Sequence, residues 1–546
     1  MRRRAPSVAE ARAKRGPQTA FARALEERAP RSTGPRRWLF VPYDQLTAEL
    51  GPLSREPAGE LGIVLVECPQ KAERRPYHKQ KLALVLANLR HFALEQAARG
   101  VAVRHVVAPA DYASALAPVV AELGKLRMME PAERELRVEL AALASSGALE
   151  VVPHEGWLTT DADFAAAGKG GEPPWRMDRF YAAVRRRTGT LMDGGKPRGG
   201  RMSHDAENRK PWRGRPPAPL PPRFTPDAIT REVGALVESH FAAHPGRLDL
   251  AALPATADDA RATWKWAERA CLPTFGPYED AMSTHSSGLF HTRLAPLLNL
   301  HRLLPRDVVA RTLALPLPLA SQEGFVRQIL GWREFVRHVH RATDGLRRIP
   351  GRPPTPDADP SALGANRPLP AAYWGERSGL ACLDHVVSDV WREGYSHHIT
   401  RLMILSNVAM LLDVSPRALT DWFWAAYIDA YDWVVEPNVL GMGTYATGDL
   451  MITKPYISGA AYVNRMSDYC GGCTFDPAST CPLTPMYWAF LARHEGVLAS
   501  NPRMIVPLSA LRKRPAAKRA HDAEVFAAVS ASLENGEGLD PHARSV

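Results

Sequence analysis

The sequence predicts an α/β domain followed by an all-α domain, and two patterns carry this prediction. In the first third of the chain, short apolar runs alternate with segments of helical periodicity, which is typical of a doubly wound parallel sheet. From residue 236 to about 500, apolar residues recur at helical spacing without strand-like alternation. At 546 residues the chain is long enough for at least two such cores.

Four short apolar runs are the expected strands of the α/β domain, at residues 38–41, 63–66, 101–107 and 149–152. Apolar residues within 82–93 recur at helical spacing until Gly100, where a helix should end. The first strand is followed by PYDQL and by no glycine fingerprint, which argues against an ordinary dinucleotide site. Ligands of such sheets bind beyond the carboxyl ends of strands, where Asp44, Gln45 and Glu67 should lie.

Composition divides the chain into five expected parts. They are a disordered basic leader at 1–36, the α/β domain at 37–155, a basic connector at 156–235, the helical domain at 236–510 and a polar C-terminal tail at 511–546.

The net charge of +11 is concentrated in two segments. Residues 1–37 hold eleven Arg and Lys against three Glu, and residues 176–215 hold twelve against four acidic residues. The second segment also contains Phe180, Tyr181 and Trp212, a mixture that favours nucleic-acid contact over a merely solvated linker.

The sequence contains no apolar run long enough for a membrane span, and the leader lacks the apolar core of a secretory signal. We therefore expect a cytoplasmic protein without a membrane partner. In that reducing compartment the six cysteines should be ligands or free thiols rather than disulfides.

Three thiols within twelve positions suit a metal site: Cys470 and Cys473 frame two glycines, and Cys481 precedes a proline. Cys382, just before a predicted helix, is the most plausible fourth ligand. The spacing leaves zinc and an iron–sulfur cluster both open.

A second constellation is aromatic. It comprises Trp374, Trp391, Trp422, Phe423, Trp424, Tyr427, Tyr431 and Trp433. Each alone is best explained by core packing, but as a set they could line a planar redox cofactor and pass electrons. The same stretch holds Arg401 and Asp429, which should form a buried ion pair, and the adjacent histidines His397 and His398.

Several long segments resemble a known family. They are YDQL at 43–46, HKQKLALVLANLRHFA at 78–93, the basic segment 178–212, FGPYEDAM at 275–282, LFHTRLAPLLN at 289–299, QILGWREFVR at 328–337 and the stretch 396–491. Together they resemble the photolyase and cryptochrome flavoproteins, specifically the bacterial branch with an iron–sulfur cluster, over about residues 37–495.

The resemblance implies a helical domain that holds FAD and a [4Fe-4S] cluster, the latter bound by the four cysteines. The implied flavin contacts are Thr292, Arg293, Leu294, Gln328, Arg333, Glu334, Arg401 and Asp429. It also implies an antenna chromophore, expected to be 6,7-dimethyl-8-ribityllumazine, in the α/β domain near Asp44, Gln45 and Glu67.

The implied activity is light-dependent repair of UV-damaged DNA, with the (6-4) pyrimidine photoproduct as the expected lesion. His398 matches an active-site histidine of (6-4) photolyases, Tyr456 should lie near the substrate opening, and Trp422 and Trp374 should relay electrons. The expected phosphate contacts are Arg185, Arg186, Arg187, Lys196, Arg209 and Lys210. A monomer, associated with the nucleoid when it binds DNA, suffices for this chemistry.

Two other functions remain open at this point. A cryptochrome-like photoreceptor would use the same cofactors for signalling, although residues 496–546 offer little for a partner to bind. A zinc-stabilised nucleic-acid-binding protein would lack flavin altogether.

Overall fold

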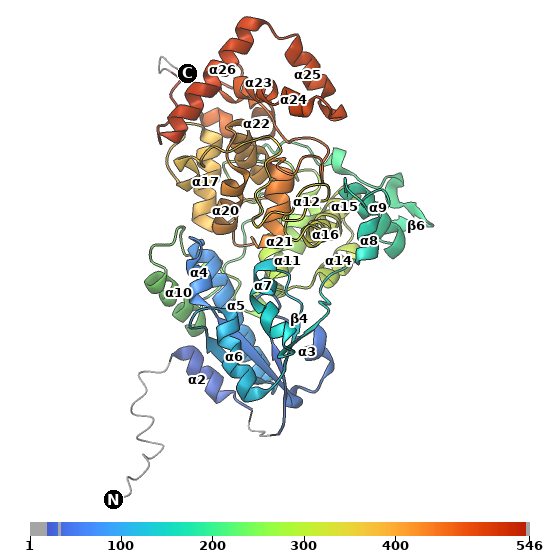
Figure 1. Ribbon diagram of the computed structural model, residues 1–546, viewed down its shortest axis with the longest axis vertical. Helices are drawn as coiled ribbons and strands as arrows, with labels where there is room; N and C mark the ends of the chain where they lie inside the picture. Colours follow the sequence, from blue (N-terminus) through green and yellow to red (C-terminus); the bar gives the residue numbers. More distant parts are fainter. Residues whose placement is uncertain (1–18, 31–33, 542–546) are drawn as a thin grey trace, which may run out of the picture.

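The computed structural model describes residues 19–30 and 34–541 of the chain. The α/β part and the helical part lie at opposite ends of an elongated molecule, with the green and yellow-green segments of the connector and early helical domain beside their junction (Figure 1).

The α/β part is built on one five-stranded parallel sheet of order β3-β2-β1-β4-β5. Its strands are β1 (Arg37–Phe40), β2 (Leu61–Glu67), β3 (Ala102–Val107), β4 (Leu126–Met129) and β5 (Leu149–Val152). The four predicted strands are confirmed. The sequence analysis missed β4, because its four residues include Arg127 and no β-branched side chain.

Helices α5 (Lys79–Ala98), α6 (Tyr112–Leu123) and α7 (Arg134–Ser145) connect and cover these strands. Helix α5 also joins the two halves of the molecule, because Lys81 Nζ donates to the carbonyl oxygens of Trp424 and Ala430 at 2.8 and 2.6 Å. Burial holds the Lys81 pKa well below its usual value.

The connector is more ordered than its composition indicates. It contains α8 (Asp161–Ala165), α9 (Met177–Thr188), the short hairpin of β6 (Met192–Asp193) and β7 (Lys196–Pro197), and α10 (Ala228–His240). Helix α10 returns to pack against α5. One face of α9 is buried and includes Phe180, Tyr181 and Val184. These side chains hold the helix against the rest of the protein, although the segment as a whole is basic.

Helices form the rest of the chain, as predicted. Those that position the sites are η6 (Arg327–Arg333), α16 (Glu334–Ala342), α17 (Ala381–Glu393), α18 (His398–Thr400), η8 (Arg401–Ser406), α20 (Pro416–Ala426), α21 (Asp432–Val435) and α23 (Leu483–Arg493). Both η6 and η8 are π-helical, a local widening that is frequent at functional sites.

Both ends of the chain contain helices where the sequence analysis predicted a disordered leader and a polar tail. Helix α2 (Ala20–Glu27) lies within the leader, whose residues 1–18 and 31–33 are outside the described residues. Helix α25 (Ile505–Arg512) ends at the start of the predicted tail, and α26 (Ala516–Glu534) lies within the tail and packs on α23. Helix α26 buries a narrow apolar stripe of Val525, Val529 and Leu533. The many polar residues around this stripe led the sequence analysis to predict a polar tail instead of a packed helix.

Among the described residues, no helix is both long and apolar enough to cross a membrane.

Candidate functional sites

A bidentate ion pair joins Arg401 and Asp429 in the helical domain, as predicted. Arg401 Nη1 and Nη2 donate to the two Asp429 carboxylate oxygens at 3.0 and 2.9 Å, and Nε donates to the Ser396 carbonyl at 2.8 Å. Burial lowers the Arg401 pKa, but Asp429, Tyr427 and Tyr395 together raise it above its usual value, so the guanidinium stays charged. Its face lies 4.0 Å from the Tyr427 ring centroid.

A second guanidinium, that of Arg293, lies beside this pair. Arg293 has a φ of +53°, a strained value for a non-glycine residue, and follows the buried Thr292. Its Nη2 donates to Ser287 Oγ and Glu393 Oε2, both at 2.7 Å. Arg293 and Arg401 share one aromatic neighbour, because both lie over the Tyr395 ring, at 4.4 and 5.8 Å.

Three histidines meet next to these arginines. One ring nitrogen from each of His291, His397 and His398 lies within 4.8 Å of the others. A metal ion lies in the plane of each imidazole that binds it, yet His291 and His397 are stacked in parallel at 4.5 Å, with 7° between the planes. The arrangement therefore suits proton chemistry better than a metal.

The three histidines differ in burial: His291 and His397 are buried, and His398 is exposed. Burial lowers the pKa of both His291 and His397 well below the usual range, and the nearby histidines lower it further. Neither ring nitrogen of His397 has a partner within the described part of the chain. The His398 side chain is 42% exposed, so it is the one of the three best placed to exchange a proton with a ligand.

Gln328 reaches this cluster through Glu279, a residue to which the sequence analysis assigned no role. Gln328 Nε2 donates to Glu279 Oε1 at 2.5 Å, and Arg327 donates to Oε2 at 3.2 Å. The Glu279 carbonyl oxygen lies 3.1 Å from His291 Nε2.

Arg333 and Glu334 hold the interdomain connector. Glu334 Oε2 accepts hydrogen bonds from the backbone N–H of Leu158, from that of Thr159 and from Thr159 Oγ1, at 2.8 to 3.1 Å. The Arg333 guanidinium lies between Trp157 and Trp433, 4.4 and 5.2 Å from their centroids. These two side chains are thus engaged away from Arg401.

A half-buried acidic residue, Asp280, lies between His398 and Arg209. Asp280 lies 3.8 Å from both His398 Nε2 and Arg209 Nε. Burial raises the pKa of Tyr456, Asp205 raises it further and Arg209 lowers it, so Tyr456 belongs to the same surface. Asp280 stands in the FGPYEDAM segment, but nothing in the sequence alone indicated its contact with His398.

Three tryptophans form a continuous path from the surface inward. Trp374, which is 45% exposed, stacks on Trp391 at 5.5 Å, and Trp391 meets Trp422 edge-on at 5.9 Å. The indole N–H groups of Trp391 and Trp422 both donate to the Tyr373 carbonyl at 2.9 Å. Trp422 then contacts Tyr427, the residue under Arg401, at 6.0 Å. The sequence analysis singled out the two ends of this path and missed Trp391 as the bridge.

Four cysteines line one small cavity between α17 and the start of α23: Cys382, Cys470, Cys473 and Cys481. All are free thiols. Burial raises the pKa of Cys382 and that of Cys481, the latter to about 11, and the neighbouring thiols raise both further. A bound cation would reverse this balance, because it stabilises the thiolate.

The separation of these sulfur atoms bears on the choice of metal. Among the described residues, no three of the four lie within 4.8 Å of one another. The sulfur ligands of one tetrahedral Zn²⁺, at about 2.3 Å from the metal, lie roughly 3.8 Å apart. As placed here, the four sulfur atoms are therefore too far apart to coordinate one Zn²⁺ ion together.

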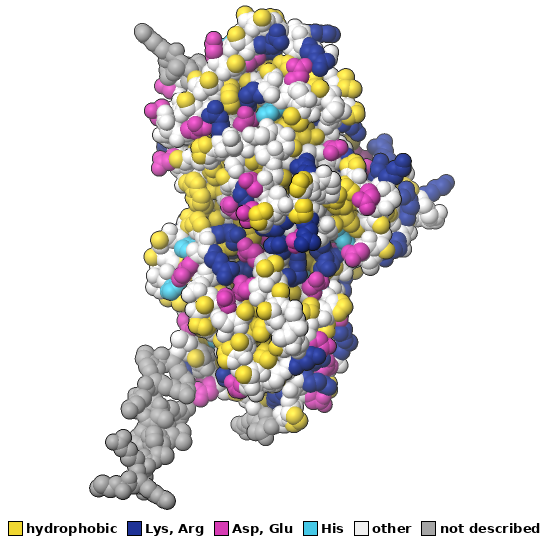
Figure 2. All heavy atoms as spheres, in the orientation of Figure 1, with side chains coloured by type: hydrophobic (Ala, Val, Ile, Leu, Met, Phe, Trp, Pro, Cys, Tyr) yellow, Lys and Arg dark blue, Asp and Glu magenta, His cyan; other side chains and the backbone are white. Residues whose placement is uncertain are grey.

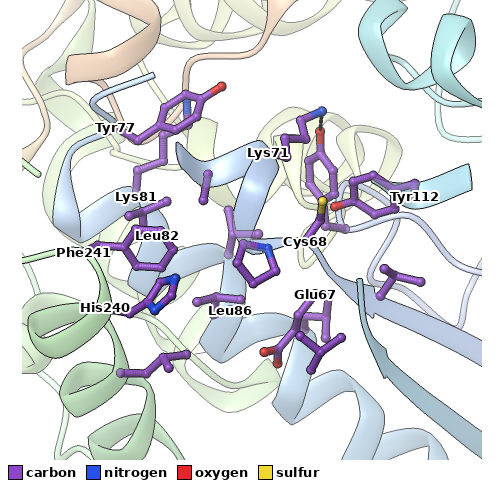
Figure 3. A pocket seen from close by; sticks show the side chains of 18 of the residues that line it. Glu67, Cys68, Lys71, Tyr77, Lys81, Leu82, Leu86, Tyr112, His240 and Phe241 are labelled. Carbon is purple, nitrogen blue, oxygen red and sulfur yellow. Dashed lines mark hydrogen bonds between the residues drawn. The ribbon is translucent and has the colours of Figure 1, made fainter. Parts of the chain in front are cut away.

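The α/β part holds a cavity of about 260 Å³ at the carboxyl end of β2 (Figure 3). Leu82 and Leu86 of α5 and Phe241 after α10 form apolar walls, and aromatic rings close the rest. Lys71 Nζ donates to Tyr43 Oη and Glu133 Oε2, both at 2.8 Å. Such a lining, apolar with a few fixed polar groups, is typical of a site for an organic ligand.

Of the three residues predicted for this site, only Glu67 lines the cavity. Gln45 Nε2 donates to the carbonyl oxygens of Met129 and Glu130 at 3.2 Å, which fills the crevice between β1 and β4 where the strand order reverses. Asp44 is buried, and burial raises its pKa to about 6. Asp44 and Gln45 thus lie beyond the carboxyl end of β1 without lining this cavity, and their contact with a chromophore stays a prediction.

The basic connector divides into surface and buried residues. Arg186, Lys196, Arg209 and Lys210 are exposed. In Figure 2, Lys and Arg side chains cluster at the rim of the lobe that carries α9 and β6. Arg187 is half exposed and pairs with Asp163.

The prediction of a phosphate contact for Arg185 was wrong. Its side chain is 1% exposed and donates to the carbonyl oxygens of Thr190, Leu191 and Met202. It braces the turn after α9.

Comparisons with known proteins agree with one another. The family described as deoxyribodipyrimidine photo-lyase-related protein matches residues 39–252. A protein of Agrobacterium fabrum named (6-4) photolyase is 35% identical over 485 residues, which cover 85% of this chain and 93% of the relative. An uncharacterized protein of Acanthamoeba polyphaga mimivirus is 41% identical over 66 residues, 12% of this chain and 54% of that protein.

The fold is also similar to a solved structure. The crystal structure of a bacterial class III photolyase from Agrobacterium tumefaciens superposes with a TM-score of 0.53 over 92% of this chain and 99% of that one, at 13% sequence identity.

Proposed function

The chain belongs to the deoxyribodipyrimidine photolyase-related family, and from that premise we propose that it repairs the (6-4) photoproduct of UV-damaged DNA in a light-dependent reaction. One observation carries this proposal: the buried Arg401–Asp429 pair lies beside a histidine cluster whose exposed member, His398, opens onto a surface with Arg209.

The residues at this pair fit a flavin. A buried guanidinium and the partnerless ring nitrogens of His397 offer positive charge and hydrogen bonds to a planar, electron-accepting ligand. FAD, when bound there, supplies the light-driven electron. Arg401 would stabilise negative charge on it, and Asp429 would hold Arg401 in place.

The turn Thr292–Leu294 and Gln328 complete the proposed flavin shell. Arg293 provides a second fixed guanidinium within the cluster, and Gln328 is oriented by Glu279. Glu334 is engaged with Thr159 of the connector, and Arg333 Nη1 donates to Glu334 Oε1 at 3.3 Å. The buried Arg333 Nε has no hydrogen-bond partner among the described residues, so we keep both residues as candidates for the shell.

His398 would supply the proton that repair requires. His291 and His397 are buried, whereas the His398 ring faces solvent beside Asp280, so His398 is the histidine of the cluster that a bound lesion would reach. Tyr456 borders the same opening and would contact the displaced bases.

The tryptophan path would carry electrons from the protein surface to the proposed flavin site. An electron that leaves Trp422 is replaced from Trp391, and that of Trp391 from Trp374. The indole N–H groups of Trp391 and Trp422 are held by the Tyr373 carbonyl, so proton loss is favoured at the exposed Trp374. A soluble thiol then returns one electron and one proton to Trp374.

Cys382, Cys470, Cys473 and Cys481 would ligate a [4Fe-4S] cluster. The wide spacing of their sulfur atoms supports a cluster over zinc. Because the ligands lie on α17 and next to α23, the cluster would fasten these two helices together.

The α/β cavity would hold the antenna, 6,7-dimethyl-8-ribityllumazine or a compound of the same class. Its aromatic and apolar walls would pack on the heteroaromatic rings, and Glu67 would accept hydrogen bonds from the ligand.

Exposed basic residues near the opening would bind the DNA backbone. Arg186, Lys196, Arg209 and Lys210 are the candidates, although Arg209 is paired with Asp205 and Asp280, as Arg187 is with Asp163. The damaged dinucleotide must leave the duplex, and unpairing and unstacking it costs a few kcal/mol. The lesion lowers this cost because it has already weakened base stacking.

The proposal predicts a defined holoprotein. Purified protein should contain FAD, four iron and four sulfide per chain, and it should repair a (6-4) oligonucleotide in light but not in darkness. Flavin binding without light-dependent repair would favour the photoreceptor instead, and stoichiometric zinc without flavin would contradict the family assignment of cofactors.

A further inference from the structure

Helix α2 of the leader is docked on the α/β part rather than free. It begins at Thr19, whose side chain accepts a hydrogen bond from the Ala22 N–H at 3.1 Å, and it packs against both α5 and α10 (Figure 1). Its one buried residue is Phe21, 3% exposed.

Phe21 contacts Arg90, which lines the cavity, and His105 of β3. Its ring lies 5.3 Å from the Arg90 guanidinium and meets the His105 ring edge-on at 5.0 Å. Its backbone N–H donates to Glu232 Oε2 at 3.2 Å, while Arg90 donates to Glu232 Oε1 at 2.7 Å. Phe21 and Arg90 thus share one carboxylate.

Arg90 and His105 in turn fix Glu67 on the cavity wall. Arg90 Nε and Nη2 donate to the two Glu67 oxygens at 2.7 and 2.9 Å, and His105 Nε2 lies 3.1 Å from Oε1. Burial raises the Glu67 pKa, but these hydrogen bonds outweigh burial and hold it at about 2. Glu67 therefore remains a carboxylate, pointing toward the cavity (Figure 3).

The shared carboxylate also connects α2 to the cavity wall on α10. Glu232 lies on α10 one turn before Leu236 and two before His240, so all three share a face of the helix. Leu236 and His240 line the cavity, as do Leu82 and Leu86 of α5. By holding Glu232 and Arg90 together, α2 fixes the distance between the two walls.

We propose that α2 is a clasp that determines how tightly the cavity binds its chromophore, acting through Phe21, Arg90 and Glu232. This inference rests on the proposed antenna function of the cavity. Without the clasp, water reaches the Arg90–Glu67 pair and α10 is free to move from α5. The binding site then loses the preorganisation on which affinity depends.

The test compares the holoprotein with a Phe21→Ala variant and with a chain lacking residues 1–30. Binding of 6,7-dimethyl-8-ribityllumazine is followed by the quenching of its fluorescence, with flavin and iron content measured on the same samples. We expect at least a tenfold weaker Kd in both variants, with unchanged flavin and iron. Glu27→Ala, on the exposed face of α2, is the matched control and should bind like the parent.

Each outcome has a distinct meaning. Equal affinity of the parent and Phe21→Ala would overturn the clasp while leaving the antenna proposal standing, and a parent that binds no lumazine would overturn both. If Phe21→Ala does not fold, Glu232→Gln provides the same comparison, because it weakens the shared contact without opening a cavity in the core.

Discussion

The helical half and the α/β half of the molecule hold their sites by opposite means. Around Arg401 the side chains are tied by charge pairs, with Asp429 on one guanidinium and Glu393 on the other. The α/β cavity is open, about 260 Å³, and mostly apolar, and its charged side chains are paired with one another on the wall, Arg90 with Glu67 and Lys71 with Glu133. The first arrangement is suited to stabilising charge on a redox cofactor, and the second to holding a ligand by shape.

The largest expected effect is the loss of the proton donor in the helical half. His398→Ala should lower the repair rate by about 10²- to 10⁴-fold, because general acid catalysis is worth that much, and flavin absorbance should not change. Single-turnover repair under constant light measures it. His521→Ala, an exposed histidine of α26, is the control; undiminished repair by His398→Ala would remove His398 from the mechanism.

The charge pair should matter for stability as well. Asp429→Asn leaves the Arg401 charge without its partner and should lower the free energy of unfolding by about 3 kcal/mol. This value is at the lower end of the range for breaking a buried ion pair, because 22% of the Arg401 side chain is exposed to solvent. Urea titration of the holoprotein measures the change.

An exposed pair provides the matched control for this variant. Glu150→Gln, which breaks the solvent-exposed contact with Lys125, should leave stability unchanged. Equal loss in the two variants would mean that the central pair has no special role.

The junction between the halves should weaken in acid. His78 stacks on Trp391 at 5.9 Å, and burial lowers its pKa to about 4. Between about pH 6.5 and 4 the unfolded chain binds this proton and the folded chain does not, so stability falls as pH falls, by on the order of 2 kcal/mol.

The variant His78→Asn tests whether His78 causes this pH effect. Asparagine can still cap α5, where His78 Nδ1 accepts the Gln80 N–H, but it does not titrate. The slope of Tm between pH 7 and 4.5 should be shallower in His78→Asn than in the parent. Parallel slopes would refute this assignment.

The smallest expected effect is on the rate at which electrons reach the helical site. Trp391→Phe keeps a ring between Trp374 and Trp422 but removes the oxidisable indole, so thiol-dependent flavin photoreduction should slow several-fold at unchanged Tm. Transient absorption should show the tryptophan radical confined to Trp422. Trp488→Phe, away from this path, should have no effect, and an unaffected rate in Trp391→Phe would exclude the bridge.

The comparison also shows what sequence can predict. Four strands and the helical domain followed from apolar periodicity, because buried elements repeat their pattern along the chain. Strand β4 and the anchored helices α2 and α26 did not, since a few apolar residues such as Phe21 or Val529 decide their docking while most of the segment is polar.

The sites divide in the same way. The Arg401–Asp429 pair was predictable because an unpaired charge is costly in a core. The cysteines were predictable because three of them lie within twelve positions of the sequence. Arg185 was misassigned because a buried arginine that bonds three carbonyls looks, in sequence, like any basic surface residue. Trp391 and Asp280 act through contacts between segments distant in sequence, which no local pattern encodes.

The central claim is that the helical half carries out light-driven repair of one lesion. Reduced holoprotein is illuminated with oligonucleotides that carry either a single (6-4) photoproduct or a single cyclobutane dimer, with dark samples in parallel. The account predicts restored pyrimidines from the (6-4) substrate alone and only in light. An unchanged (6-4) lesion, in protein whose bound FAD is shown to be reduced, would contradict it.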